Sequence, residues 1–427
     1  MNQNSKYITD VAYPLYFYKE IQPLWLCTIV KFLGLIPPND ENFTYCELGC
    51  GAGLNLIIAA TFNQKSKFIG MDFNEKHINY AKNAVKQIGL KNIEFLHVDF
   101  EKFLKSTNLK FDFIVCHGVW SWISKKEQKN ILDIAAKTLK SKGLFYLHYM
   151  CHPGSTHTLE LQKLLNILSL HTDGNSAAKI EYAFGKLKEI AKSGIFLNRV
   201  GFDEYLKKLE SKTANYLAHE FLTDNWSVEH SVDIHSIVAQ TGAIYIGSAN
   251  IFENIDDSLS IPAQMQQSVS DVSSIILKEM LKDLARNQAN RMDLFQKEPK
   301  MPDKEKRLSQ IDDVCFKLLS NPVTKEGAKF NTPIGEINAP LELLNPVIDR
   351  LKQKATTFGR LKQLPIFTNN MRVLFQTIEL LIMQGNIHVS KNILYEKSKE
   401  LHELTKWIDK NRISIQIIPE CQTAIIL

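Results

Sequence analysis

Short apolar runs alternate with amphipathic segments over the first 150 residues of the chain. Apolar residues recurring every three or four positions predict helices at 54–62 and at 74–88, the second ending at Gly89. A further helix is expected after Ser124, which with Glu127 has the spacing of a capping box. The runs that read as strands are 45–48, 68–72, 93–98, 111–115 and 144–149. This alternation predicts an α/β fold with a doubly wound, Rossmann-like, mostly parallel sheet.

Beyond residue 155 the pattern becomes mainly helical. A leucine stripe over 161–168 and a long apolar periodicity over 268–295 predict helices. The run 243–247 is expected to complete the sheet, which makes 172–230 an insertion over the active-site end. The charged stretch 296–306 reads as a linker, and the remainder resembles a small winged-helix-like module. The predicted division is an N-terminal helical segment that serves as a lid (1–40), a core (41–155, with 236–252 added to its sheet), a helical middle domain (156–300) and a C-terminal domain (301–427).

Composition adds only limits to this picture. The chain is 44% apolar and 23% charged, with a formal net charge of +5, which is ordinary for a globular protein and calls for neither nucleic acid nor membrane. Seven scattered cysteines without C-x-x-C spacing predict neither a disulfide framework nor a zinc site, and no metal is expected. No apolar run is long enough for a transmembrane segment, and the polar start does not resemble a signal peptide. The expected location is therefore cytoplasmic.

Three glycines at alternate positions follow the first predicted strand. Gly49, Gly51 and Gly53 permit a sharp turn into the next helix, whose free N–H groups can meet a polar ligand. The spacing differs from the G-x-G-x-x-G of dinucleotide sites. Glu47 lies just before the turn, where an acid would repel a pyrophosphate but suit an ammonium group. The methionine end of S-adenosylmethionine carries such a group.

Two further acids end successive apolar runs. Asp72 lies 23 residues after Gly49, near the spacing at which an acid binds ribose hydroxyls, and Asp99 follows the third strand. Carboxyl ends of parallel strands meet at one edge of a sheet, so these acids point to one crevice. The alternative for Asp72 and Asp99 is that they only cap helices.

With these motifs in view, residues 41–150 resemble a class I S-adenosylmethionine-dependent methyltransferase. Tyr13-Pro14, Glu20, Pro23, the run 117–122 and the run 218–222 are similar to bacterial methyltransferases with a methyltransferase regulatory domain, a group that includes protein-lysine methyltransferases. The resemblance implies that Glu47 and the glycine turn hold the methionine part, Asp72 the ribose, and Asp99 with Phe100 the adenine. The expected cofactor-binding residues are Glu47, Gly49, Cys50, Gly51, Gly53, Asp72, Phe73, Asp99, Phe100 and His117.

The acceptor is expected beyond the fourth and fifth strands. The loops there carry three histidines, two tryptophans and a tyrosine. The family usually has Asn where Met150 stands, so no side-chain amide is assigned to the acceptor. Packing remains the alternative for each ring, and His148 remains open as the base instead of His117. We predict that Trp120, Trp122, His117 and Tyr149 line one pocket, with Tyr13 or Tyr16 closing it. The predicted catalytic set is His117, Trp120, Tyr149 and Tyr13.

These features predict a methyltransferase that acts on a protein, with lysine side chains as acceptors. A cationic donor and a lysine both suit aromatic faces. Nucleic acid is disfavoured, because neither an Asp/Asn-Pro-Pro-Tyr-like tetrad nor a Pro-Cys dipeptide occurs. A small-molecule N- or O-methyltransferase and a non-catalytic, cofactor-binding interaction protein remain alternatives. Substrate docking, homodimer formation and regulation stay open as roles of the C-terminal domain.

Overall fold

The computed structural model of the protein describes residues 7–195, 202–254, 257–323, 328–332, 334–391 and 398–427. Its centre is a seven-stranded sheet in the order β3-β2-β1-β4-β5-β7-β6. The first five strands are parallel, and β7 runs antiparallel to both its neighbours. The strands are β1 Thr44–Leu48, β2 Lys67–Asp72, β3 Ile93–His97, β4 Phe111–Cys116, β5 Leu139–Met150, β6 Ala243–Ser248 and β7 Asn290–Lys297.

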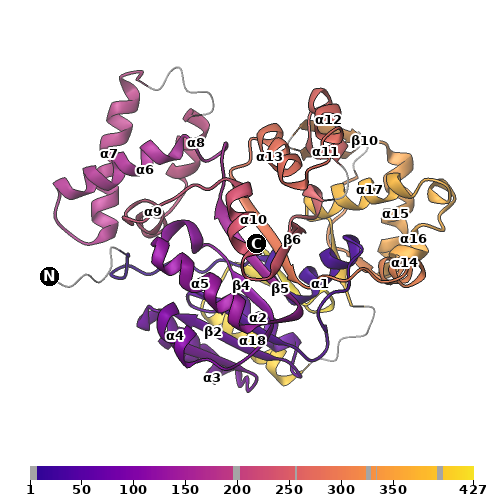
Figure 1. The fold of residues 1–427 in the computed structure, drawn as a ribbon, viewed down its shortest axis with the longest axis horizontal. Helices are drawn as coiled ribbons and strands as arrows, with labels where there is room; N and C mark the ends of the chain where they lie inside the picture. Colours follow the sequence, from indigo (N-terminus) through magenta and orange to yellow (C-terminus); the bar gives the residue numbers. More distant parts are fainter. Residues whose placement is uncertain (1–6, 196–201, 255–256, 324–327, 333, 392–397) are drawn as a thin grey trace.

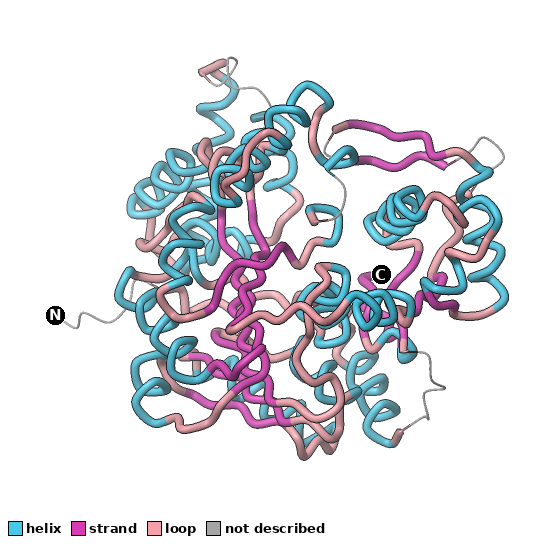
Figure 2. The backbone as a smooth tube through the Cα atoms, turned by 45° about the vertical axis from the view of Figure 1, so that its right-hand side comes forward, coloured by secondary structure: helices cyan, strands magenta, loops and turns pink. Residues whose placement is uncertain are grey.

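Helices cover both faces of this sheet, which confirms the predicted doubly wound arrangement (Figure 2). The first face is covered by α1 Pro23–Phe32, α2 Leu54–Phe62 and α3 Glu75–Ile88. The second face is covered by α4 Phe100–Ser106, α5 Lys125–Thr138 and α10 Ser231–Ala239.

Local signals explain where several of these helices begin and end. Asn74 caps α3 by accepting a bond from the Lys76 N–H, and Gly89 ends the helix in a left-handed conformation. Ser124 caps α5 by accepting from the Glu127 N–H, as predicted. The other half of the expected capping box is not made, because the Ser124 N–H donates to the Tyr7 hydroxyl.

The middle of the chain forms a helical lobe, seen at the upper left of Figure 1. Its own apolar cluster includes Leu165, Leu187 and Phe221, together with Val11 from the N-terminal segment. The lobe therefore has a small core separate from the two cores of the sheet. Its helices are α6 Thr158–Leu168, α7 Ser176–Lys192, α8 Phe202–Glu210 and α9 Ala214–Phe221.

The prediction that 243–247 joins the central sheet is confirmed, but its neighbour in the sheet was missed. A single long helix was expected over 268–295, whereas two helices are followed by β7. The expected linker at 296–306 is also wrong at its start, because Gln296 is buried in β7 and donates to the carbonyls of Ile36 and Lys142. The two helices are α12 Ala263–Ser270 and α13 Ile275–Arg286, and the short α11 Asp257–Ser260 precedes them.

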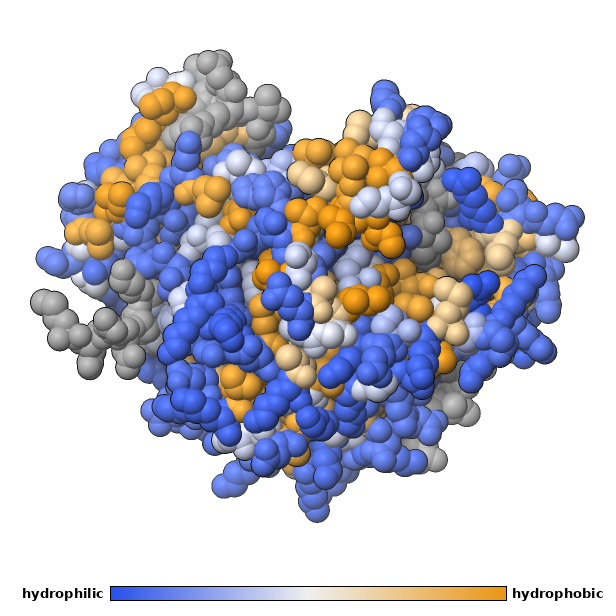
Figure 3. Space-filling model, in the orientation of Figure 1, coloured by the Kyte–Doolittle hydropathy of each residue, from blue (hydrophilic) through white to orange (hydrophobic). Residues whose placement is uncertain are grey.

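Helix α13 exposes an apolar side. Ile275, Ile276, Leu277 and Leu284 are exposed, whereas Glu279, Lys282 and Asp283 are buried. Figure 3 shows apolar side chains gathered over this region. The apolar periodicity that predicted a helix here therefore does not mark its buried face.

The last part of the chain shares the core of the first face. A three-stranded antiparallel sheet, β11-β8-β12, lies among helices, and buried residues such as Leu374 belong to the same cluster as Tyr45. Helix α18 contacts α2 and α3. The remaining elements are α14 Lys304–Asp312, β8 Cys315–Leu318, β9 Ala328–Thr332, β10 Gly335–Ala339, α15 Leu341–Gln353, β11 Thr356–Thr357, α16 Phe358–Leu361, α17 Met371–Met383, β12 Ile387–Ser390, α18 Lys399–Lys410, β13 Ile415–Ile418 and β14 Thr423–Ile426.

Within the residues that the structure describes, no helix combines the length and apolar character that a membrane crossing requires.

Candidate active site

The glycine turn connects β1 to α2 in a backbone conformation that favours glycine. Gly49, Gly51 and Gly53 have φ angles of +73°, +53° and +76°. The N–H groups of Gly49 and Cys50 donate to the Met71 carbonyl at 2.9 and 3.0 Å, which fixes the turn on β2. A Cβ on Gly53 would lie 2.3 Å from the Phe95 ring, whereas one on Gly51 would meet nothing within 4 Å. The turn is thus packed at Gly53 and open at Gly51, where a ligand can lie on bare backbone.

Two buried carboxylates flank this turn. Asp72 accepts from the Gly51 N–H at 3.0 Å and from the Asn74 N–H at 2.8 Å. Glu47 is buried, and its Oε2 has no hydrogen-bond partner among the described residues. Burial, and secondly the charge of Asp72, raise the pKa of Glu47 to about 8. A buried carboxylate without a partner, beside an open backbone turn, fits the ammonium group of the expected cofactor.

The residues expected around the adenine are more exposed. Asp99 accepts from the Lys102 N–H at 2.8 Å and so caps α4, which is the helix-capping alternative raised above. Phe73 is 45% exposed, with its ring centroid 5.5 Å from that of Tyr7. Phe100 packs partly buried against the second-face cluster. Asp99 lies at the expected end of the sheet, and its adenine role stays a prediction.

Two stacked imidazoles lie at the carboxyl ends of β4 and β5. The ring centroids of His117 and His148 are 4.5 Å apart. His117 Nδ1 is 2.7 Å from the Tyr146 hydroxyl, and the Gly118 N–H donates to His148 Nδ1 at 3.3 Å. Burial lowers the pKa of His148 to about 4. Burial, and secondly the nearby His148, lower the pKa of His117. Burial therefore favours the neutral form of both imidazoles, which is the form that can accept a proton, and also makes both weaker bases.

The N-terminal segment is attached to the first turn of α2. Asn55 Oδ1 accepts from the Tyr18 N–H at 2.8 Å, and Asn55 Nδ2 donates to the Tyr16 carbonyl at 3.3 Å. The Tyr18 ring lies 3.9 Å from that of His117. The ring that reaches the histidine is thus Tyr18, which the sequence reasoning missed. Two features of the sequence could have indicated this contact, namely the polar Asn55 beside the glycine turn and the three closely spaced tyrosines at 13, 16 and 18.

Helix α9 brings a second group of polar and aromatic side chains to this segment. The Tyr13 ring lies 6.4 Å from that of Tyr216 and 5.2 Å from that of His219. Burial raises the pKa of the neighbouring Glu220 to about 7, although a hydrogen bond with Tyr216 partly opposes the shift. The run 218–222 contributed to the family resemblance, but no role in the site was predicted for His219 or Glu220.

Two of the four predicted catalytic residues lie away from this group. Trp120 and Tyr149 are fully buried in the cluster of the second face. The Tyr149 hydroxyl donates to Asp293 Oδ2 at 2.5 Å. Side chains alternate across a strand, so Tyr149 must point opposite to His148, its neighbour in β5. The prediction that Trp120 and Tyr149 line one pocket with His117 is therefore wrong.

The indole of Trp122 forms a hydrogen bond with the backbone of α9. Its Nε1–H donates to the Glu220 carbonyl at 3.3 Å, which links the loop after β4 to the end of α9.

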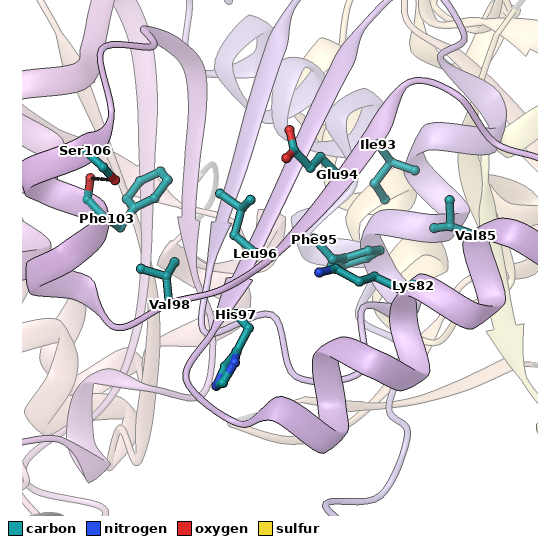
Figure 4. A pocket seen from close by; sticks show the side chains of 10 residues that line it. All are labelled: Lys82, Val85, Ile93, Glu94, Phe95, Leu96, His97, Val98, Phe103 and Ser106. Carbon is teal, nitrogen blue, oxygen red and sulfur yellow. Dashed lines mark hydrogen bonds between the residues drawn. The ribbon is translucent and has the colours of Figure 1, made fainter.

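An open cavity of about 500 Å³ lies elsewhere, along the outer edge of β3 (Figure 4). Side chains of α3 and α4 flank the strand there. Glu47, the glycine turn and His117 do not line this cavity. Its lining residues are Lys82, Val85, Ile93, Glu94, Phe95, Leu96, His97, Val98, Phe103 and Ser106.

Comparison with known proteins agrees with this geometry. Residues 39–195 match a family model described as a methyltransferase domain. Residues 213–297 match one described as a predicted methyltransferase regulatory domain. The Synechocystis sp. protein sll1526 is 26% identical over 404 residues, which are 94% of this chain and 79% of that protein.

Among solved structures, PKMT2 from Rickettsia typhi has a similar fold. It superposes with a TM-score of 0.72 at 19% identity, covering 97% of this chain and 86% of that chain. Its complex with AdoHcy gives a TM-score of 0.66 at 20% identity, over 88% of this chain and 77% of that chain. The chain therefore contains a methyltransferase domain joined to a methyltransferase regulatory domain, and its cofactor is S-adenosylmethionine.

Proposed function

We propose that this methyltransferase transfers methyl groups to lysine side chains of a protein. The observation that carries the proposal is the stacked pair of imidazoles, His117 and His148, with ring centroids 4.5 Å apart at the carboxyl end of the sheet. Strand alternation places them on the same face as Glu47 and Asp72. The fold similarity to PKMT2, a protein lysine methyltransferase, supports the same assignment.

The residues divide into cofactor-holding and acceptor-facing groups. Glu47, Asp72 and the backbone of the glycine turn would hold S-adenosylmethionine, which supplies a methyl group on a sulfonium. A lysine ammonium must lose a proton before its nitrogen can act as a nucleophile. Burial beside aromatic rings lowers the pKa of such an ammonium. In this proposal His117, kept neutral by burial and held by Tyr146, accepts the proton.

The test uses bacterial cell extract and isotope-labelled S-adenosylmethionine. Tryptic peptides should carry the label on lysine when the intact chain is added. The matched control is Glu47→Gln, which should strongly reduce labelling at limiting cofactor concentration, because its affinity for S-adenosylmethionine should fall. Label confined to small molecules would instead identify a small-molecule acceptor and contradict the proposal. His117→Asn should slow lysine labelling by roughly a hundredfold or more, the scale of a lost general base, without loss of cofactor binding.

A further inference from the structure

Helix α9 carries three chemically active residues on one face. Tyr216, His219 and Glu220 are three and four residues apart, so they lie on the same side of a helix. The other side, with Leu217 and Phe221, is buried in the core of the helical lobe. Ring distances place the active side against the N-terminal segment, with Tyr216 5.9 Å from Tyr16. The helix thus faces the methyl-acceptor end of the site with its polar side.

Glu220 lies in an unusual environment for a carboxylate. It is only partly covered, yet it is surrounded closely enough by protein that burial raises its pKa to about 7. Tyr216 hydrogen-bonds to it, and the charge of Glu220 acts on Tyr13, Tyr18 and Tyr205. Among the described residues, no lysine, arginine or histidine forms an ion pair with it. One cation is already close, because Lys212 Nζ lies 5.3 Å from the centroid of the Tyr216 ring. The Glu220 carboxylate itself is partly exposed and has no ion-pair partner among the described residues, so it can meet a second cation from outside.

The tyrosines connect this carboxylate with the candidate base. Tyr13 packs against Tyr16 at 5.9 Å, and Tyr16 against Tyr18 at 6.3 Å between ring centroids. Tyr18 in turn contacts His117. The tyrosine cluster, defined as Tyr13, Tyr16, Tyr18 and Tyr216, therefore runs from the carboxylate of Glu220 to the imidazole of His117. Ring faces attract cations, and the attraction grows when the cation is desolvated.

We propose that Glu220 and the tyrosine cluster bind the primary ammonium group of the methyl acceptor, which makes Glu220 the residue that selects an amine. The inference rests on the proposed function and deepens it. A hydroxyl acceptor could donate a hydrogen bond to this carboxylate, whereas an alkylammonium gains the attraction between two full charges in addition. Because α9 lies within 213–297, the regulatory domain would contribute directly to acceptor recognition. Cofactor and acceptor would then each have one carboxylate, Glu47 on β1 and Glu220 on α9.

The test measures binding of n-butylammonium and of n-butanol to the full chain by NMR titration with S-adenosylhomocysteine present. The two probes have similar shapes and differ in charge. The intact chain should prefer the cation, and Glu220→Gln should remove that preference, lowering the cation's affinity by about tenfold or more. Glu204→Gln is the matched control, because Glu204 is an exposed acid on the neighbouring helix α8. It should leave both affinities unchanged.

The pH dependence gives a second readout. A carboxyl with a pKa of about 7 ionises as pH rises, so n-butylammonium affinity should increase about tenfold between about pH 6 and about pH 8. The facing groups are shifted away from this pH range, because burial raises the pKa values of the tyrosines and lowers that of His219. Tyr216→Phe removes the hydrogen bond that lowers the Glu220 pKa and should shift the midpoint to higher pH.

Two outcomes would overturn the inference. One is an intact chain that binds butanol as well as butylammonium, and the other is a folded Glu220→Gln variant that keeps the preference. If Glu220→Gln does not fold, as judged by thermal melting, the shifted midpoint of Tyr216→Phe decides instead, and an unshifted midpoint contradicts the proposal. A failure of the proposed function would look different, with cation preference intact and no labelled lysine in the extract assay.

Discussion

At the scale of single residues, Glu47, the proposed ligand of the cofactor's ammonium group, also affects stability. Its pKa of about 8 lies above the ordinary 4.5, so the folded protein keeps a proton there that the unfolded chain releases. The stability contributed by this group is complete below about pH 4.5 and is lost as pH rises through about 8. The buried Glu47 carboxyl thus makes the cofactor-free protein less stable in alkaline solution.

Glu47→Gln separates these two effects. Without the ionisable carboxyl, the cofactor-free protein should melt at a higher temperature than the unchanged chain at about pH 9, with little difference at about pH 5. S-adenosylmethionine affinity should fall by at least about tenfold, since a hydrogen bond to a charged group contributes roughly 1.5–3 kcal/mol. Calorimetry at both pH values measures the affinity and the melting temperature. A variant that binds the cofactor normally would show that Glu47 does not contact it.

The sequence located the loops of the site but assigned some of their side chains to the wrong face. His148 and Tyr149 are adjacent, and both were treated as acceptor-facing. Strand alternation allows only one of them to face the first side, and burial of Tyr149 in the second-face cluster settles which. By the same rule, the side chain of His117, just after β4, lies on the same face of the sheet as Val115 and on the opposite face from Cys116. Register within each strand was available from the sequence, whereas the partner elements on each face were not.

At the scale of elements, the glycine turn offers a matched pair of substitutions. Alanine at Gly51 or Gly53 carries the left-handed backbone penalty of about 1–2 kcal/mol. At Gly53 the added Cβ also meets the Phe95 ring, and overpacking of this kind costs roughly 1–3 kcal/mol more. Urea unfolding should therefore show Gly53→Ala to be the less stable variant. Gly51→Ala should lose more cofactor affinity than its stability change explains, because its Cβ occupies the open side of the turn. Equal stability of the two variants would contradict the packing assigned to Gly53.

A second element-scale prediction concerns how the N-terminal segment is held. Asn55→Ala removes both bonds to the segment that carries Tyr16 and Tyr18. Acceptor turnover should fall by about tenfold or more, since misplacement by about 1 Å can cost a hundredfold, while cofactor affinity changes little. Asn63→Ala, at the other end of α2, removes only a bond to the Ala59 carbonyl and serves as the control. Steady-state kinetics with calorimetry distinguishes the two, and equal losses would point to a general effect on α2.

Two elements late in the chain show why sequence periodicity was insufficient. β7 reads Asn-Arg-Met-Asp-Leu-Phe-Gln-Lys, and its Arg291, Asp293 and Gln296 are all buried. A strand with three buried polar residues does not show the apolar alternation used to find strands. α13 has the complementary character, since it buries Glu279 and Asp283 and exposes apolar residues. Both elements bury charged residues because these pair with one another: Arg291 of β7 forms ion pairs with Glu279 and Asp283 of α13.

At the scale of the whole molecule, this buried polar network joins the two matched domains. Arg291 bonds Asp293 at 2.9 Å and Glu279 at 2.9 Å, and also pairs with Asp283. His235 from α10 contacts Asp293 at 2.8 Å. Buried charges are tolerated when each is paired and hydrogen-bonded. The network therefore connects β7, α10 and α13 of the regulatory domain, and the Tyr149 hydroxyl connects it to β5 of the methyltransferase domain.

Tyr149→Phe tests this structural role against the catalytic role expected from the sequence. Burial alone would raise the pKa of Asp293, but Arg291, His235 and Tyr149 together hold that pKa below 3.8. Loss of the hydroxyl removes one bond to a charged group, which should lower the free energy of unfolding by roughly 1–3 kcal/mol. Turnover per folded molecule should stay unchanged, because the ring faces away from His117. Tyr182→Phe is the control, since its partly exposed hydroxyl has no hydrogen-bond partner among the described residues. Denaturant unfolding and kinetics on the same preparations provide both readouts. If turnover is lost while stability is unchanged, Tyr149 acts in catalysis, and the second face of β5 must then contribute to the active site.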